Sequence, residues 1–219
     1  MQFENTIASF DAAIRLGADG VELDVRRTRD GHLVVHHDPR IPGAALPIER
    51  LSLSEVKARR LPSRDRIPTL DEALARLGHA AVVVELKGRA SARELGRLLE
   101  RQPSRPGLRI SSFNHKMLAQ LTGKRYPLAL TIDRLEPDTL RKAARMGATE
   151  LHIRYTLIDA SLVSKAHRMN LAVLAWTVDR PEDFARMREL EVDGVITNKV
   201  ERALQYFQKK KTPRTRGTA

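Results

Sequence analysis

Short apolar runs recur along the chain at nearly regular intervals, and this period constrains the fold more than any other feature of the sequence. The runs are rich in Val, Ile and Leu and nearly continuous, as strands buried on both faces are. They lie at residues 20–25, 33–35, 81–86, 108–111, 128–132, 151–153, 171–176 and 194–197. From residue 82 onward, successive runs start 20 to 27 residues apart. A strand and a helix at that period predict an α/β protein with a parallel sheet, and the regularity favours a (β/α)8 TIM-type barrel over a doubly wound sheet.

The segments between the apolar runs carry helix signals. Residues 69–72 and 91–94 are capping boxes, in which a hydroxyl and a carboxylate satisfy backbone donors at a helix start. Gly17 and Gly147 suit helix ends, and Pro181 suits a first helical turn after Asp179. The Asp-Gly pair at 30–31 predicts a turn that folds the run at 33–35 back as a hairpin on the run at 20–25.

The 219 residues suit one domain, because no Gly/Ser-rich or Pro-rich linker divides them. We expect a single barrel domain over residues 1–208 and a basic, disordered tail over residues 209–219. Cysteine is absent, which excludes disulfide scaffolds, thiolate zinc sites and cysteine nucleophiles. No apolar run approaches the ~20 residues that span a bilayer, and no signal-peptide pattern is visible, so we expect a cytoplasmic protein without a transmembrane segment.

The net charge of +12 suggests an anionic partner. Arginines scattered over helix faces and an aromatic content of 4% argue against a specific nucleic-acid partner. The tail carries five of the positive charges, so weak contact with a membrane surface is expected there.

Two carboxylates on one buried strand give the first candidate site. Glu22 and Asp24 are two residues apart and share a face. They repel each other and lose hydration, and a divalent cation resolves both costs. Oxygen ligands favour a hard ion such as Mg²⁺ or Ca²⁺. The alternative is an ion pair between one of these carboxylates and Arg26 or Arg27.

The same spacing recurs at Glu85 and Lys87, at the end of the run 81–86. A third carboxylate on the same barrel face would complete a cation site, and Lys87 would then supply a point charge for an anionic substrate. The alternative is an internal ion pair between the two.

Two adjacent histidines, His36 and His37, precede Asp38 at the end of the run 33–35. Neighbouring strand residues point to opposite sides, so only one histidine can face the site. A histidine beside a cation and a phosphate suits general acid–base work, although a histidine at a strand end is more often structural.

In their order along the chain these motifs resemble the glycerophosphodiester phosphodiesterases. The matching segments are ENT (4–6), GVELDV (20–25), TRDG (28–31), VVHHDP (34–39), IPTLDE (67–72), VELK (84–87), SSF (111–113), AWTV (175–178) and DGVITN (193–198). The resemblance implies a (β/α)8 barrel and a metal-dependent hydrolase that converts glycerophosphodiesters to glycerol 3-phosphate and an alcohol, in lipid and glycerol metabolism. It implies a small-molecule substrate and Mg²⁺ or Ca²⁺ as the cofactor.

The family pattern also assigns roles to individual residues. Its metal ligands correspond to Glu22, Asp24 and Glu85, and its catalytic histidine to His37 rather than His36. Lys87 matches a lysine near the phosphate. The aromatic residues Phe113 and Trp176 match side chains at strand ends that would line the alcohol side of the pocket.

One family motif has no counterpart in this sequence. Family members carry a first strand ending in His-Arg-Gly, which supplies a second acid–base histidine and a phosphate-binding arginine, some eight residues before the Glu-Asn-Thr motif. Here Met1 stands three residues before Glu4. A truncated chain and a natural variant both account for this, and the intact carboxylates and His37 favour truncation. We expect seven of eight barrel strands, reduced turnover and unpaired sheet edges that favour an oligomer or a low melting temperature.

Two other functions are compatible with the sequence. A non-catalytic protein could bind a phosphodiester or a phospholipid headgroup without turnover, which the missing motif would explain. A lysophospholipase D would share the fold and the metal chemistry but take a lipid substrate.

Overall fold

A computed structural model describes residues 3–88, 92–101, 105–123 and 125–207. In this part of the chain, seven strands run parallel to one another in chain order. They are β1 (Gly20–Arg27), β3 (Ala81–Leu86), β4 (Leu108–Ser112), β5 (Leu128–Ile132), β6 (Glu150–Arg154), β7 (Ala172–Trp176) and β8 (Gly194–Val195). The expected α/β fold is therefore confirmed, with the seven barrel strands that the sequence predicts.

The predicted hairpin is also present. Strand β2 (Leu33–Val35) pairs antiparallel with β1 through Val25 and Val35, so the full sheet order is β2-β1-β3-β4-β5-β6-β7-β8. The turn before β2 includes Gly31 at φ 89°, a conformation that glycine adopts without strain. This hairpin places His36 beside Asp24 of β1, whose carbonyl oxygen accepts from the His36 N–H.

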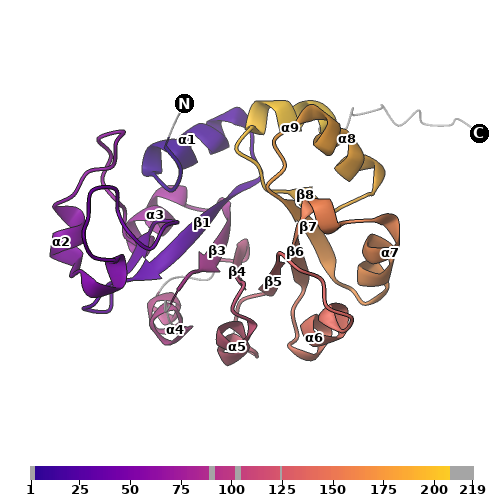
Figure 1. Cartoon of the computed structure of the whole chain (residues 1–219), viewed down its shortest axis with the longest axis horizontal. Coiled ribbons are helices and arrows are strands. Elements are labelled where there is room, and N and C mark those ends of the chain that lie inside the picture. Colours follow the sequence, from indigo (N-terminus) through magenta and orange to yellow (C-terminus); the bar gives the residue numbers. More distant parts are fainter. Residues whose placement is uncertain (1–2, 89–91, 102–104, 124, 208–219) are drawn as a thin grey trace, which may run out of the picture.

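Helices surround the outer side of the curled sheet (Figure 1). They are α1 (Ile7–Leu16), α2 (Leu53–Lys57), α3 (Leu70–Leu77), α4 (Ala92–Glu100), α5 (His115–Leu118), α6 (Thr139–Arg145), α7 (Ala160–Arg168), α8 (Pro181–Glu189) and α9 (Val200–Phe207), with 3-10 turns at Ile48–Arg50, Ala119–Leu121 and Tyr155–Leu157. None of the helices in the described segments is both long and apolar enough to cross a bilayer.

Several predicted helix ends are confirmed. Thr69 accepts a hydrogen bond from the backbone of Glu72 and forms the expected capping box of α3. Gly17 ends α1 at φ 98°, and Pro181 lies in the first turn of α8, although Arg180 rather than Asp179 is the N-cap residue. Ser91 of the second capping box and the tail at 209–219 lie outside the described residues, so the boundary of the domain at residue 208 stays a prediction.

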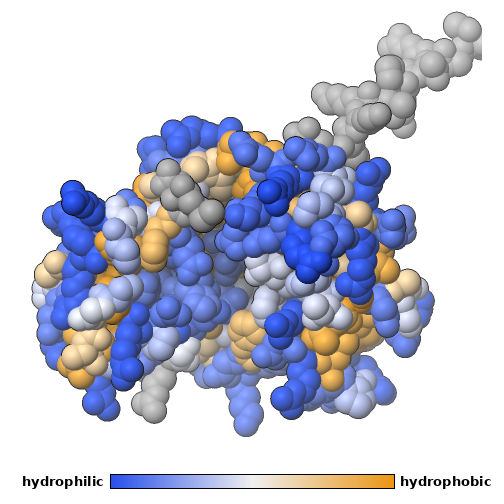
Figure 2. Space-filling view, turned by 45° about the horizontal axis from the view of Figure 1, so that its top comes forward, coloured by the Kyte–Doolittle hydropathy of each residue, from blue (hydrophilic) through white to orange (hydrophobic). Residues whose placement is uncertain are grey.

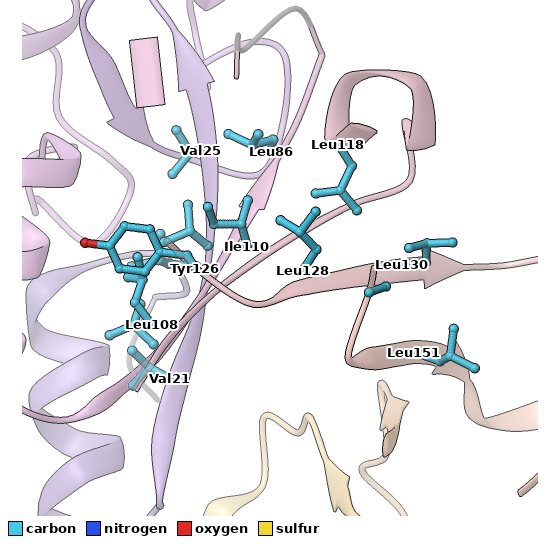
Figure 3. Packing of buried hydrophobic residues seen from close by; sticks show 14 of the residues in the cluster. Val21, Val25, Leu86, Leu108, Ile110, Leu118, Tyr126, Leu128, Leu130 and Leu151 are labelled. Carbon is cyan, nitrogen blue, oxygen red and sulfur yellow. The ribbon is translucent and has the colours of Figure 1, made fainter. Parts of the chain in front are cut away.

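Side chains alternate between the two faces of each strand. On β1, Val21, Leu23 and Val25 point outward into the main hydrophobic core. Apolar side chains of β1, β3, β4, β5 and β6 pack in one layer with Leu118 of α5 (Figure 3). Because the helices cover this face, the intervening residues of the strands point to the inner face of the curl. That geometry places the polar residues of the sequence motifs together inside the sheet.

Residues 38–68 form a long connecting segment between β2 and α3, and this segment has a small hydrophobic core of its own. Its buried side chains are Ile41, Ile48, Leu51, Val56, Leu61 and Ile67, packed around Val34 of β2. The face shown in Figure 2 is largely hydrophilic and is hollowed at its centre.

The sheet is open between β8 and β1, because no ladder joins these two strands in the described part of the chain. Helices α1 and α9 contact each other above the ends of β1 and β8 (Figure 1). Leu204 of α9 lies against Gly17 at the end of α1. A helix–helix contact therefore links the two ends of the open sheet.

This contact predicts a specific effect on stability. Leu204→Ala removes half-buried side-chain carbons from the α1–α9 contact and should lower the free energy of unfolding by about 1–2 kcal/mol. The neighbouring Gln205 is exposed, so Gln205→Ala should stay within ~0.5 kcal/mol of the parent. Urea unfolding measures both, and equal effects of the two changes would contradict the role given to this contact.

Candidate active site

Three carboxylates from two adjacent strands meet on the inner face of the sheet. Glu22 and Asp24 come from β1 and Glu85 from β3, and Asp24 lies directly beside Glu85 in the parallel register. One carboxylate oxygen from each of the three lies within 4.8 Å of the others. The spacing of two residues on β1 and the alignment of the strands therefore produce the cluster that the sequence predicts.

The three carboxylates repel one another, and burial disfavours their charged forms. Burial raises the pKa of Glu22 well above its ordinary value, and the charges of Asp24 and Glu85 raise it further. Burial also raises the pKa of Glu85, although Lys87 partly opposes this. Oε1 of Glu22 is buried without a hydrogen-bond donor among the described residues, whereas Oε1 of Glu85 pairs with Lys87. A hard divalent cation fits this all-oxygen set, because it would satisfy the Glu22 oxygen and reduce the repulsion among the carboxylates.

Lys87 lies at the centre of this charge cluster. Its Nζ atom is 3.2 Å from Oδ1 of Asp24 and 2.5 Å from Oε1 of Glu85. Burial would lower the pKa of Lys87, but the two carboxylate charges outweigh burial and raise that pKa. The ammonium therefore lies between the carboxylates, where it would compete with a bound cation for the same oxygens.

The sequence also allowed an ion pair between a carboxylate of β1 and Arg26 or Arg27. The described contacts do not include such a pair. The guanidinium of Arg26 donates a hydrogen bond to the carbonyl oxygen of His37 and pairs with Glu49, 3.4 Å away. Arg27 pairs with Glu94 at 3.1 Å. Both arginines thus pair with other carboxylates, and Lys87 is the cation that pairs with Asp24 and Glu85.

The two histidines differ in exposure and in their contacts. His36 is buried, and its backbone N–H donates to the carbonyl oxygen of Asp24 at 2.8 Å. The side chain of His37 is 51% exposed, and its Nδ1 lies 2.9 Å from Oδ1 of Asp38. A protonated His37 would contribute to lowering the pKa of Glu85. The catalytic assignment of His37 stays a prediction.

The two aromatic residues extend the site from Lys87 outward. The ring of Phe113, which follows β4, lies 5.1 Å from Nζ of Lys87 and 5.4 Å from the Trp176 ring in a T-shaped pair. The indole N–H of Trp176 donates to the carbonyl oxygen of His152 at 2.9 Å. Carboxylates, lysine and both aromatics therefore form one continuous set of contacts on the inner face.

Further polar groups on this face were not identified from the sequence. Arg109 of β4 and His152 of β6 both bond Glu150, with His152 Nε2 3.1 Å from its Oε2. Burial would raise the pKa of Glu150, but these hydrogen bonds outweigh burial and lower that pKa, which indicates a structural ion pair. The hydroxyls of Ser111 and Thr131 are buried without a partner. Period-two alternation on β4, β5 and β6 was the signal that could have found them.

Comparison with known proteins assigns the chain to a family. The sequence model of the Glycerophosphoryl diester phosphodiesterase family matches residues 1–202. The chain belongs to this family. A glycerophosphodiester phosphodiesterase of Caldanaerobacter subterraneus subsp. tengcongensis is 33% identical over 227 residues, which span 94% of this chain and 93% of that protein.

Solved structures of the same family share the fold. A glycerophosphodiester phosphodiesterase of Thermotoga maritima is 29% identical with a TM-score of 0.76, over 93% of this chain and 92% of that one. A phosphodiesterase of Oleispira antarctica, solved with its product sn-glycerol-3-phosphate, is 22% identical with a TM-score of 0.87, over 94% and 91% of the two chains. The resemblance inferred from the ordered motifs is thus confirmed at the level of the family and its TIM-barrel fold.

The competition between Lys87 and a cation gives a testable consequence. Without metal, Lys87→Met leaves the buried carboxylates uncompensated and should destabilise the protein by about 3 kcal/mol. With Ca²⁺ or Mg²⁺, the same variant should show a larger rise in melting temperature than the parent, because no ammonium needs to be displaced. Thermal melts in chelator and in metal measure both effects.

Lys142→Met is the matched control, since Lys142 pairs only with the exposed carboxylates of Glu136 and Asp138 in the described contacts. It should change neither quantity measurably. A metal response of Lys87→Met no larger than that of the parent would show that the ammonium and the cation do not share these oxygens.

Proposed function

We propose that the protein hydrolyses glycerophosphodiesters with the help of a divalent cation, Mg²⁺ or Ca²⁺, and releases glycerol 3-phosphate and an alcohol. The observation that carries the proposal is the set of three clustered carboxylates, in which a buried oxygen of Glu22 lacks a donor. Family membership supports the reaction class. The product bound by the Oleispira antarctica relative supports glycerol 3-phosphate as the product here.

The carboxylates of Glu22, Asp24 and Glu85 would hold the cation. When bound there, the cation neutralises phosphate oxygens and makes the attacking hydroxyl more acidic. Lys87, once free of the carboxylates, places a second positive charge beside the phosphate. The alcohol portion of the substrate would lie along Phe113, whose ring is 38% exposed and leads outward from Lys87.

His37 is proposed to move the proton. Its Nδ1 is engaged by Asp38, which leaves Nε2 for the substrate. In the overall reaction an oxygen–phosphorus bond forms from water, the bond from phosphorus to the alcohol oxygen breaks, and one proton reaches that oxygen. A general acid or base at this point contributes roughly 10²–10⁴ in rate.

The carboxylate cluster is tested by removing two of its charges. Calcium or magnesium should raise the melting temperature of the parent, because a cation that binds only the native state stabilises it by mass action. Glu22→Gln combined with Asp24→Asn should abolish that rise and the metal-dependent release of glycerol 3-phosphate from glycerophosphocholine. The pair Glu136→Gln and Asp138→Asn changes the same number of charges on the exposed surface and should alter neither.

If the cation raises the melting temperature of the Glu22/Asp24 double variant as much as that of the parent, the cation does not bind to these residues. Metal binding and retention of glycerophosphocholine, without release of product even when an upstream His-Arg-Gly strand is supplied, would instead identify a binding protein. Faster release from a lysophospholipid than from glycerophosphocholine would identify a lysophospholipase D.

The two histidines are distinguished by parallel substitutions. In a chain that carries an upstream His-Arg-Gly strand, His37→Ala should lower the turnover number by ~10²-fold or more and leave cation affinity unchanged. His36→Ala should affect stability more than rate, because His36 is buried and its Nε2 lies 3.3 Å from the carbonyl oxygen of Arg40. Steady-state kinetics together with thermal melts separate the effects. An inactive His36 variant beside an active His37 variant would reverse the assignment.

A further inference from the structure

Asn5 makes two hydrogen bonds to one residue of the carboxylate cluster. Its Nδ2 donates to Oδ2 of Asp24 at 2.8 Å, and its Oδ1 accepts from the backbone N–H of Asp24 at 3.0 Å. The side chain is buried, and 19 residues of sequence separate the two partners. A single amide thus holds both the main chain and the carboxylate of Asp24.

The chemistry of the partners fixes the orientation of the amide. A backbone N–H needs an acceptor and a carboxylate oxygen needs a donor, so only one assignment of the Asn5 oxygen and nitrogen satisfies both. The carbonyl oxygen of Asp24 accepts from the N–H of His36 at 2.8 Å. These contacts leave Oδ1 of Asp24 as the oxygen that faces Glu85 and Lys87, since Lys87 Nζ lies 3.2 Å from it.

The backbone at Asn5 restricts which residues can do this. Its φ of 57° lies in the left-handed region, which Gly, Asn and Asp adopt most readily. Glycine has no side chain to offer, and aspartate would set a second carboxylate against Oδ2 of Asp24. Thr6, the next residue, caps α1 by accepting from the N–H of Ser9, which anchors this segment to the helix. Asparagine alone of the three supplies both the donor and the acceptor.

We propose that Asn5 is a positioning residue for the cation site, a role that rests on the proposed function. It does not touch the cation. It aims Oδ1 of Asp24 at the other two carboxylates by occupying Oδ2 and holding the Asp24 backbone. Groups that orient metal ligands in this way typically change metal affinity by 10- to 100-fold when they are removed.

The test is a calorimetric titration of the metal-free full chain with Ca²⁺ alone and with Mg²⁺ alone. Asn5→Gly keeps the left-handed backbone without strain and removes both hydrogen bonds, so its dissociation constant should rise about 10- to 100-fold. Thr6→Ala is the matched control, because this neighbouring substitution removes the N-cap of α1 but no contact to Asp24. Its melting temperature should fall while its dissociation constant stays within twofold of the parent value.

The outcomes separate this proposal from the one on which it rests. If the parent binds neither cation, both proposals are overturned, because there is no site for Asn5 to organise. If the parent binds and Asn5→Gly binds equally well, or Thr6→Ala loses as much affinity, the positioning role alone is overturned. Should Asn5→Gly not fold, Asn5→Asp keeps the acceptor for the Asp24 N–H and removes the donor to Oδ2. Affinity equal to or tighter than that of the parent in this variant overturns the role.

Discussion

Repulsion among three carboxylates inside the sheet is the interaction on which the rest of the site depends. Glu22, Asp24 and Glu85 are brought together by strand register alone, at a place where burial raises the pKa of two of them. Such a cluster persists only when a positive charge accompanies it. Lys87 supplies that charge in the described contacts, and the proposed cation would supply it during function. The repulsion among these carboxylates therefore accounts for the position of Lys87, for the proposed cation and for the hydrogen bonds that hold Asp24.

The open side of the sheet lies next to this cluster. The backbone of Asp24 is satisfied there by the Asn5 side chain and the His36 N–H. The α1–α9 contact links the two ends of the curved sheet, beside β1 and β8. Helix packing and an asparagine side chain together hold the strand that carries two of the three carboxylates, which ties the stability of this region to the geometry of the site.

Much of this arrangement could be predicted from the sequence because it follows from short-range periods. The apolar runs predicted the strands, and the Asp-Gly pair predicted the β2 hairpin. The spacing of two residues predicted that Glu22 and Asp24 share a face of β1. What could not be predicted depends on contacts between distant residues. The Asn5–Asp24 bonds, the Arg26–Glu49 pair and the separate core of residues 38–68 have no local signature, since side-chain partners far apart in sequence are fixed only by the folded chain.

The most direct measurement of the central claim is a crystal structure of the protein soaked with Ca²⁺, with anomalous scattering used to locate the ion. The account predicts one ion within ~2.3–2.6 Å of an oxygen from each of the three carboxylates, the usual range for calcium. It also predicts that Nζ of Lys87 has left Asp24 and Glu85 and lies closer to the Phe113 ring. An ion bound elsewhere, or carboxylates still paired with Lys87 at saturating Ca²⁺, would contradict it.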